Sequence, residues 1–277
     1  MTINCKGVLI DLNKPKVMGI LNVTPDSFYD GGKFKYDTSI LKQTEKLLEE
    51  GATFVDLGAI SSRPDATDIS EEEELRRILP VVNLLIDAFP EINLSIDTFR
   101  SIVARHCLES GASMINDISS GNMDRHMMQT ISDFKVPYVM MHMKGTPQNM
   151  SRQATYNNLI EEVLFYMSEK AALAKSFGIN DIILDPGFGF AKTASQNFSL
   201  LQHLDLFGTF GLPILVGLSR KSMIYKTLGT NAAQALNGTT ALHALALTKG
   251  ANILRVHDVK EAMECVELIE ALKQTED

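Results

Sequence analysis

Eight short apolar runs are spaced along the chain, and almost every one of them ends in a polar residue. In chain order the runs are 17–22, 53–56, 93–97, 113–117, 138–142, 182–185, 214–219 and 252–257. They are apolar at nearly every position, which is typical of parallel strands that are buried on both faces. Helix-like stretches separate them, so the pattern predicts a (β/α)8 TIM barrel whose polar strand ends meet on one face.

The chain before the first run predicts a β-hairpin. Residues 3–14 contain two short strand-like segments around a turn at Lys6 and Gly7, and this hairpin would cover the closed end of the barrel. Helices are predicted at about 38–50, 71–89, 99–110, 124–132 and 156–177, with a final helix that runs to about Lys273.

Capping residues support several of these helices. Ser70 followed by Glu73 predicts a capping box, and Asp258 can cap the final helix. Pro80 should kink its helix or mark its first turn. We interpret the acidic run 71–74 as a solvated helix start that complements the helix dipole.

The rival architecture is a doubly wound open sheet. Such a sheet would favour a GxGxxG loop after the first strand, and the sequence GILNVTPDS does not fit one. No linker or low-complexity segment divides the chain, so we expect one domain over residues 1–277. Two long loops, 24–38 and 58–70, are of a length that is uncommon without a function.

Composition narrows the class of protein. A net charge of −8 and a pI near 5.3 disfavour binding to nucleic acid or to an anionic membrane surface. No apolar run approaches the ~20 residues of a membrane span, and the N-terminus does not resemble a signal peptide. Three widely spaced cysteines fit a reduced cytoplasm.

The strand ends carry candidate binding groups. Asp97, Asn116 and Asp185 would present a row of acceptors that can read the donor edge of a heterocycle with an amino group and a ring NH. A single such Asp could instead cap the next helix, but these three together with Asp56 favour a binding site. The loop DPGFGFAKT after Asp185 has two glycines that let backbone approach a ligand closely, although a packed loop is the alternative.

Cationic residues follow the last two strands. Ser219, Arg220, Lys221, Arg255 and His257 supply donors where barrels frequently hold phosphate, so together they favour anion binding over isolated surface charges. Arg63 in the second long loop could close over the same anion.

His142 could in principle ligate a metal. It has no second His or carboxylate at a ligand spacing, so we predict a packed, hydrogen-bonded histidine. The neighbouring Met140, Met141 and Met143 are predicted to lie in the core.

At these residues the chain resembles the dihydropteroate synthase family. The segments that carry the resemblance are MGILNVTPDSF, LSIDTFR, INDIS, MHMKGTP, ILDPGFGFAKT, VGLSRKS and LRVHDV, in the family's order over residues 17–259. The resemblance implies a transferase of folate biosynthesis that condenses p-aminobenzoate with 6-hydroxymethyl-7,8-dihydropterin diphosphate. It also implies Mg2+, a homodimer and a p-aminobenzoate site that sulfonamides target.

The same resemblance implies a role for each site residue. The pterin would be bound by Asp97, Asn116, Asp185 and Lys221, and Arg255 would stack on it. The diphosphate would be held by Arg255, His257 and Asn22, and Asn22 would also bind Mg2+. The rest of the substrate site would be formed by Ser62, Arg63, Pro64, Phe190 and Ser219. The catalytic set would be Asp97, Lys221, Arg255 and His257. We further expect the two long loops to order over the diphosphate before p-aminobenzoate binds.

The second long loop departs from the family. The family reads GGESTRPG where this chain has GAISSRPD, so Ile60, Ser62 and Asp65 replace Glu, Thr and Gly. Two alternatives stay open: a methyltetrahydrofolate-corrinoid methyltransferase, which shares the pterin-binding barrel, and a pterin-binding homologue without catalytic activity.

Overall fold

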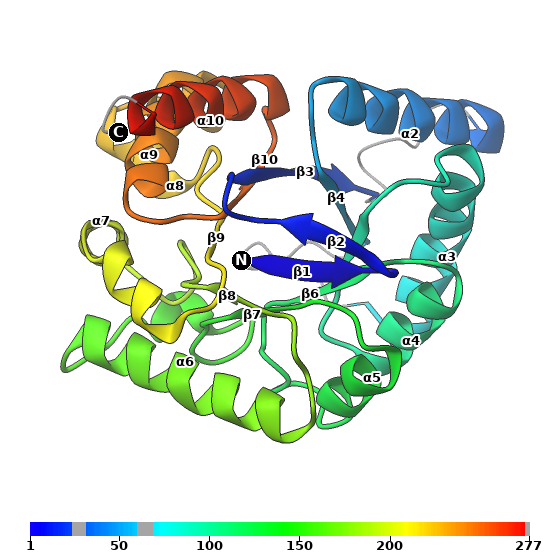
Figure 1. The fold of residues 1–277 in the computed structure, drawn as a ribbon, viewed down its shortest axis with the longest axis horizontal. Coiled ribbons are helices and arrows are strands. Elements are labelled where there is room, and N and C mark those ends of the chain that lie inside the picture. Colours follow the sequence, from blue (N-terminus) through cyan, green and yellow to red (C-terminus); the bar gives the residue numbers. More distant parts are fainter. Residues whose placement is uncertain (24–31, 60–68, 275–277) are drawn as a thin grey trace.

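The computed structural model describes residues 1–23, 32–59 and 69–274, which form a parallel barrel surrounded by helices (Figure 1). The barrel strands are β3 (Lys16–Asn22), β4 (Phe54–Gly58), β5 (Leu94–Asp97), β6 (Met114–Asp117), β7 (Tyr138–Met141), β8 (Ile182–Asp185), β9 (Leu215–Val216) and β10 (Ile253–Val256). Neighbours in the ring follow chain order, and β10 lies between β9 and β3. A parallel bridge between Leu184 and Ile214 joins β8 to β9. The predicted (β/α)8 barrel is therefore confirmed, and the open-sheet alternative is wrong.

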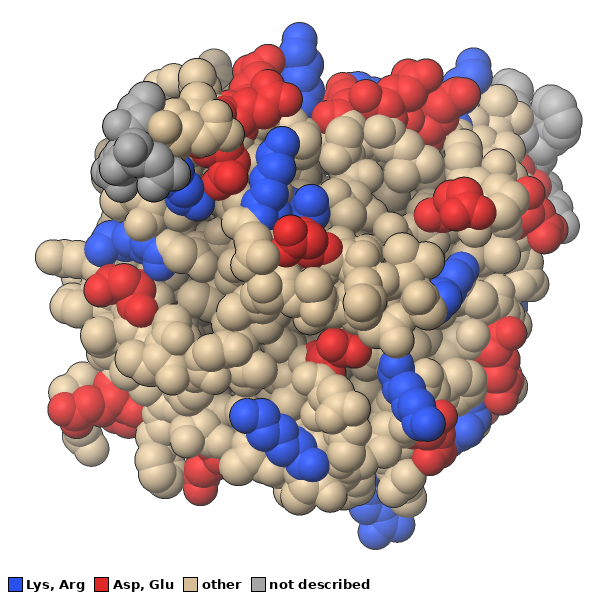
Figure 2. Space-filling model, viewed as in Figure 1, with Lys and Arg blue, Asp and Glu red and all other residues tan. Residues whose placement is uncertain are grey.

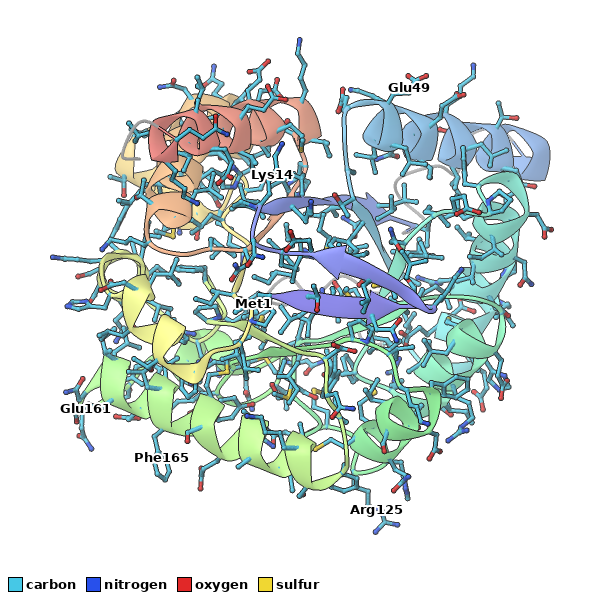
Figure 3. The ribbon with its side chains drawn as sticks, in the orientation of Figure 1. Met1, Lys14, Glu49, Arg125, Glu161 and Phe165 are labelled. Atoms are coloured by element: carbon cyan, nitrogen blue, oxygen red, sulfur yellow. The ribbon has the colours of Figure 1, made fainter. Side chains whose placement is uncertain are left out.

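Helices cover the outside of the barrel. They are α2 (Gly32–Glu49), α3 (Glu71–Ala88), α4 (Ser101–Glu109), α5 (Met127–Phe134), α6 (Leu159–Ser176), α7 (Ala194–Gln202), α8 (Ser222–Thr227), α9 (Leu236–Thr248) and α10 (Val259–Lys273), with 3-10 turns at Met150–Arg152, Leu204–Phe210 and Ala232–Gln234. Their outer faces meet solvent, as the outward-pointing side chains of Glu161 and Phe165 on α6 illustrate (Figure 3). The predicted helices all occur, but α2 begins at Gly32, so the end of the predicted loop 24–38 is helical. The helices α7, α8 and α9 have no counterpart among the predicted ranges, although the alternation of strands and helices requires helices there.

The hairpin closes one end of the barrel. β1 (Thr2–Cys5) pairs antiparallel with β2 (Val8–Asp11), and the hairpin crosses the barrel in Figure 1. Lys6 and Gly7 have φ angles of 53° and 86°, the left-handed conformation that a two-residue hairpin turn requires. The buried side chains of the hairpin segment pack with inward-facing side chains of the strands, among them Met18 and Phe54. The predicted hairpin lid is confirmed.

Helix α3 shows what the capping signals do. Ser70 Oγ accepts a hydrogen bond from the Glu73 amide at 3.2 Å, so Ser70 is the N-cap, but the structure shows only this half of the predicted capping box. The Glu73 carboxylate binds Arg76 and Arg77 on the following turn. Pro80 lies well inside the helix, which continues through it, so it does not mark a first turn.

The acidic run at the start of α3 is not wholly solvated. Glu74 is fully buried, and its Oε2 lies 2.5 Å from Nη1 of Arg100, just after β5. The prediction of a solvated run is wrong at this residue, because helical spacing turns Glu74 toward the barrel while Glu71 and Glu72 stay exposed.

Charge on the hairpin side of the molecule is mixed. Figure 2 shows acidic and basic side chains interspersed over this face. Within the described ranges, none of the helices combines the length and the apolar character needed to cross a bilayer.

Replacing the buried Leu12 by Ala should lower the free energy of unfolding by about 2–5 kcal/mol, because it removes packed methyl groups from the closed end. Leu12 is fully buried, whereas Leu9 on the same hairpin is 70% exposed and provides the control, Leu9→Ala. Urea denaturation measures both. Equal stability of the two variants would contradict a hairpin packed into the barrel.

Candidate active site

The polar strand ends meet at the barrel end opposite the hairpin. The parallel register places Asp97 beside Gly58 on one side and beside Asn116 on the other. Arg255 lies on β10, on the other side of β3. Because every strand runs in the same direction, residues from distant parts of the chain meet at one rim.

Arg255 joins two carboxylates across this rim. Its Nε lies 2.6 Å from Oδ2 of Asp56, and its Nη2 lies 2.9 Å from Oδ2 of Asp97. The exposed fractions of the side chains are 20% for Arg255, 12% for Asp97 and 0% for Asp56. Two acids therefore share one cation, and the group keeps a net negative charge when both acids are ionised.

Asp56 also orients Asn116. The Nδ2 of Asn116 donates to Oδ2 of Asp56 at 3.0 Å, which leaves the amide oxygen of Asn116 as an acceptor. Ser95 Oγ donates to the other Asp56 oxygen at 2.6 Å. Asp56 ends the run 53–56 and is one of the polar strand ends, but nothing in the sequence marks its partners, and the resemblance assigns it no role.

Burial raises the pKa of Asp97 to about 7, against the opposing charge of Arg255. The nearby Asp56 carboxylate adds to the rise. This carboxyl group therefore titrates near neutral pH, where a change of charge affects chemistry.

The loop after β8 places Asp185 and Lys221 on the same side of the rim. Oδ1 of Asp185 accepts from the Gly187 amide at 2.8 Å. Lys221 donates to the Phe188 carbonyl, and its Nζ lies 4.7 Å from the centre of the Phe190 ring. Burial lowers the pKa of Lys221 to about 8, although Asp185 opposes this, and burial raises the pKa of Asp185.

The glycines of this loop allow protein groups to approach closely. A Cβ on Gly187 would lie 2.1 Å from the His142 carbonyl oxygen, and one on Gly189 would lie 3.2 Å from Cδ of Lys221. Phe188 is fully buried in the core, and Phe190 is partly buried. The loop is thus packed, as the alternative interpretation held, and it also places Lys221.

The cationic segments separate into two groups. Ser219 Oγ lies 2.9 Å from Nδ1 of His257, so these two predicted residues meet. Arg220 instead binds the Asp258 carboxylate through Nε and Nη2, both at 2.8 Å, and donates to the carbonyls of Ala232 and Ala233. The prediction that Arg220 is an anion donor is wrong, and Asp258 forms no side-chain cap on α10 because its carboxylate binds Arg220.

Asn22 ends β3 with an exposed side chain. A Cβ on Gly58 would lie 3.5 Å from Oδ1 of Asn22 and 3.7 Å from Oδ2 of Asp97. Glycine at this position therefore keeps open the space beside two oxygen atoms. Over the part of the chain that the structure describes, no group of three or more His, Cys, Asp or Glu residues is placed to hold a metal ion.

Other polar residues at strand ends have structural roles. Asp117 accepts hydrogen bonds from Tyr138, Ser119 and Gly121 and so fixes the turn after β6. His142 is buried with its Nδ1 2.9 Å from Nζ of Lys192, which confirms a packed, hydrogen-bonded histidine. The three methionines beside it, Met140, Met141 and Met143, are buried as predicted.

Part of the predicted site falls outside the described residues. This applies to Ser62, Arg63 and Pro64, to the departures Ile60 and Asp65, and to most of both long loops.

Comparison with known proteins gives a consistent result. A family model described as pterin binding enzyme matches residues 18–257. The dihydropteroate synthase of Escherichia coli K12 is 41% identical over 98% of this chain and 96% of its own length. The structure of Yersinia pestis dihydropteroate synthase in a sulfonamide drug complex has a TM-score of 0.92 and 39% identity over 99% of this chain and 100% of the other.

A second solved structure, Xanthomonas albilineans dihydropteroate synthase with 4-aminobenzoic acid, has a TM-score of 0.91 and 38% identity over 98% of both chains. The matched range includes the strand ends that carry Asp56, Asp97, Asn116, Asp185 and Arg255. The chain therefore belongs to the pterin binding enzymes and, within them, to the dihydropteroate synthase family.

Proposed function

We propose that the protein condenses p-aminobenzoate with 6-hydroxymethyl-7,8-dihydropterin diphosphate to give 7,8-dihydropteroate and pyrophosphate. One observation carries the proposal: buried acceptors and two cations, Lys221 and Arg255, meet at a single barrel rim. Relatives with full-length similarity bear the name of this activity. The structures with a sulfonamide drug and with 4-aminobenzoic acid support p-aminobenzoate as the second substrate.

The pterin is recognised by acceptors that are themselves buried. Asn116 and Asp185 are 4% and 7% exposed, and their oxygens accept from the amino group and ring NH of the pterin. A ligand without these donors would leave buried acceptors unpaired, at about 1–3 kcal/mol for each one. Lys221, which lies beside the same loop as Asp185, donates to the pterin.

The diphosphate lies toward the last strands. Arg255 supplies positive charge and donors there, His257 supplies a ring N–H, and Ser219 faces the carboxylate of p-aminobenzoate. Arg255 is held by Asp56 and Asp97 in a fixed orientation, so the enzyme does not have to order this long side chain when the substrate binds.

The residues fit Mg2+ as the metal. Asn22 Oδ1 is a hard oxygen donor at the open rim, and Mg2+ is held by few protein groups together with waters and substrate phosphates. When bound, the ion would neutralise charge on the diphosphate and improve it as a leaving group.

The reaction breaks the bond between the pterin methylene carbon and the diphosphate oxygen, and the electron pair leaves with pyrophosphate. The methylene carbon becomes cationic, with its charge delocalised into the pterin. The ionised Asp97 carboxylate favours this cation electrostatically. The amine nitrogen of p-aminobenzoate then forms the new C–N bond and loses a proton, so no protein nucleophile is needed.

Turnover tests the proposal directly. The protein is incubated with the pterin diphosphate, p-aminobenzoate and Mg2+, and dihydropteroate and pyrophosphate are quantified. Absence of product would contradict the proposal, and pterin binding without product would favour the non-catalytic homologue.

We further propose that the protein is a cytoplasmic homodimer. We also propose that sulfonamides inhibit it in competition with p-aminobenzoate.

Asp185→Asn should weaken pterin binding about 5- to 150-fold, which corresponds to about 1–3 kcal/mol for an unpaired buried group. The amide presents a donor where the pterin requires an acceptor. Asp181→Asn, at the other end of the same strand, is the matched control and should leave the affinity unchanged. Calorimetric titration with 6-hydroxymethylpterin measures both, and wild-type affinity in Asp185→Asn would remove this residue from the site.

The pH dependence of kcat/KM should be bell-shaped with its maximum between about pH 7 and 8. The raised pKa of Asp97, about 7, means that the required carboxylate is protonated below that pH, so activity rises as pH increases through it. The lowered pKa of Lys221, about 8, means that its required charge is lost above that pH. Lys221→Arg should extend activity to higher pH, and an unchanged alkaline limb would contradict the assignment.

Activity should require Mg2+, with Asn22 at the metal. Excess chelator should abolish turnover, and added Mg2+ should restore it. Asn22→Ala should raise the Mg2+ concentration for half-maximal activity, because one oxygen donor is lost. Full turnover in excess chelator would overturn this assignment.

A further inference from the structure

Lys192 is a buried cation close to the site that the proposed function does not use. It lies in the loop between β8 and α7 and is 9% exposed. Its Nζ lies 2.9 Å from the Gly187 carbonyl oxygen, 3.1 Å from that of Phe190 and 2.9 Å from Nδ1 of His142. The His142 carbonyl oxygen, at 3.5 Å, completes this group of neutral partners.

Burying the Lys192 ammonium group costs free energy. Lysines are rarely buried unless they are paired, because a charge in a medium of low dielectric loses its hydration. Burial lowers the pKa of Lys192 to about 7, although the charge of Asp185 opposes the change. Carbonyl dipoles and an imidazole nitrogen replace water around the ammonium group.

Two of the carbonyls that Lys192 binds, those of Gly187 and Phe190, belong to the turn that positions the protein side chains proposed to bind the pterin. The Gly187 amide donates to Asp185, and the Phe188 carbonyl accepts from Lys221. The Phe190 ring lies against the same Lys221 ammonium. The turn between the two carbonyls held by Lys192 thus contacts Asp185 and Lys221.

His142 anchors this arrangement to the barrel. Its Nδ1 faces Nζ of Lys192, and when Lys192 is charged its ammonium group only donates, so the ring proton then lies on Nε2. Burial lowers the pKa of His142 to about 2, so the ring stays neutral and remains an acceptor. The ring also packs edge-on against Tyr166, with the ring centres 4.9 Å apart.

We propose that Lys192 is a positioning residue for pterin binding: its ammonium group, held by His142 at the end of β7, fixes the Gly187–Phe190 turn and thereby places Asp185, Phe190 and Lys221. This inference rests on the proposed function. Without Lys192 Nζ the Phe190 carbonyl loses its donor, and the Gly187 carbonyl keeps only the Phe190 amide, at 3.2 Å, so the turn is held less firmly.

The primary test compares Lys192→Met with the matched control Lys144→Met. Methionine keeps the length and apolar character of the stem without the charge. Lys144 is a nearby, half-exposed lysine that binds Glu162 and the Thr155 carbonyl instead of the turn. Calorimetry with 6-hydroxymethylpterin, thermal melting, and kcat and KM for the pterin diphosphate are measured for each variant.

Lys192→Met should weaken pterin binding about tenfold or more, since two buried hydrogen bonds to the turn are lost, whereas Lys144→Met should stay within about threefold of wild type. KM for the pterin diphosphate should rise with the dissociation constant. A lower melting temperature with unchanged pterin affinity would overturn the proposal and leave Lys192 a purely structural residue. Failure of the wild-type protein to bind the pterin would instead contradict the proposed function.

A pair of variants at His142 keeps the test decisive if Lys192→Met does not fold. In His142→Asn the amide oxygen can occupy the position of Nδ1 and accept from Lys192, whereas His142→Leu provides no acceptor. The Asn variant should bind the pterin within about threefold of wild type, and the Leu variant about tenfold more weakly. Equal pterin affinity of the two variants would overturn the proposal.

Discussion

The sharing of one guanidinium group by two carboxylates governs the open end of this barrel. Arg255 satisfies Asp56 and Asp97 together, and Asp56 in turn holds Asn116. These side-chain contacts join β4, β5 and β6 to β10, in addition to the backbone hydrogen bonds between neighbouring strands. Since one positive charge faces two acids, the rim can accept further positive charge, which suits a reaction that develops a cation.

The two ends of the barrel divide stability from chemistry. At the hairpin end the packed groups are apolar, and Ile3, Leu12 and Phe54 are almost fully buried there. At the other end the buried groups are ionisable, and their pKa values are displaced because burial penalises charge. The protein tolerates this cost at the end where we propose that substrate binds, and apolar packing elsewhere compensates for it.

The periodic pattern predicted the barrel well because each strand is short, apolar and buried on both faces. It also placed Asp97, Asn116, Asp185, Ser219, Lys221 and Arg255 at strand ends, where parallel direction brings them together. The pattern could not predict which side chains pair with each other. Arg220 and Lys221 are adjacent in sequence, yet one binds Asp258 and the other binds the Phe188 carbonyl. The pattern predicts a solvated run at Glu74 and does not single out Lys192, because burial depends on contacts with distant segments.

The seam between β8 and β9 has a consequence for how the molecule responds to its ligand. Five residue pairs join β3 to β4, whereas a single bridge, Leu184 with Ile214, joins β8 to β9. The proposed pterin contacts Asp185 on one side of this seam and Lys221 on the other. A bound pterin would therefore stabilise the pairing of β8 with β9, which has the fewest bridges in the ring. Amide hydrogens around Leu215 would then exchange more slowly in the complex than in the free protein.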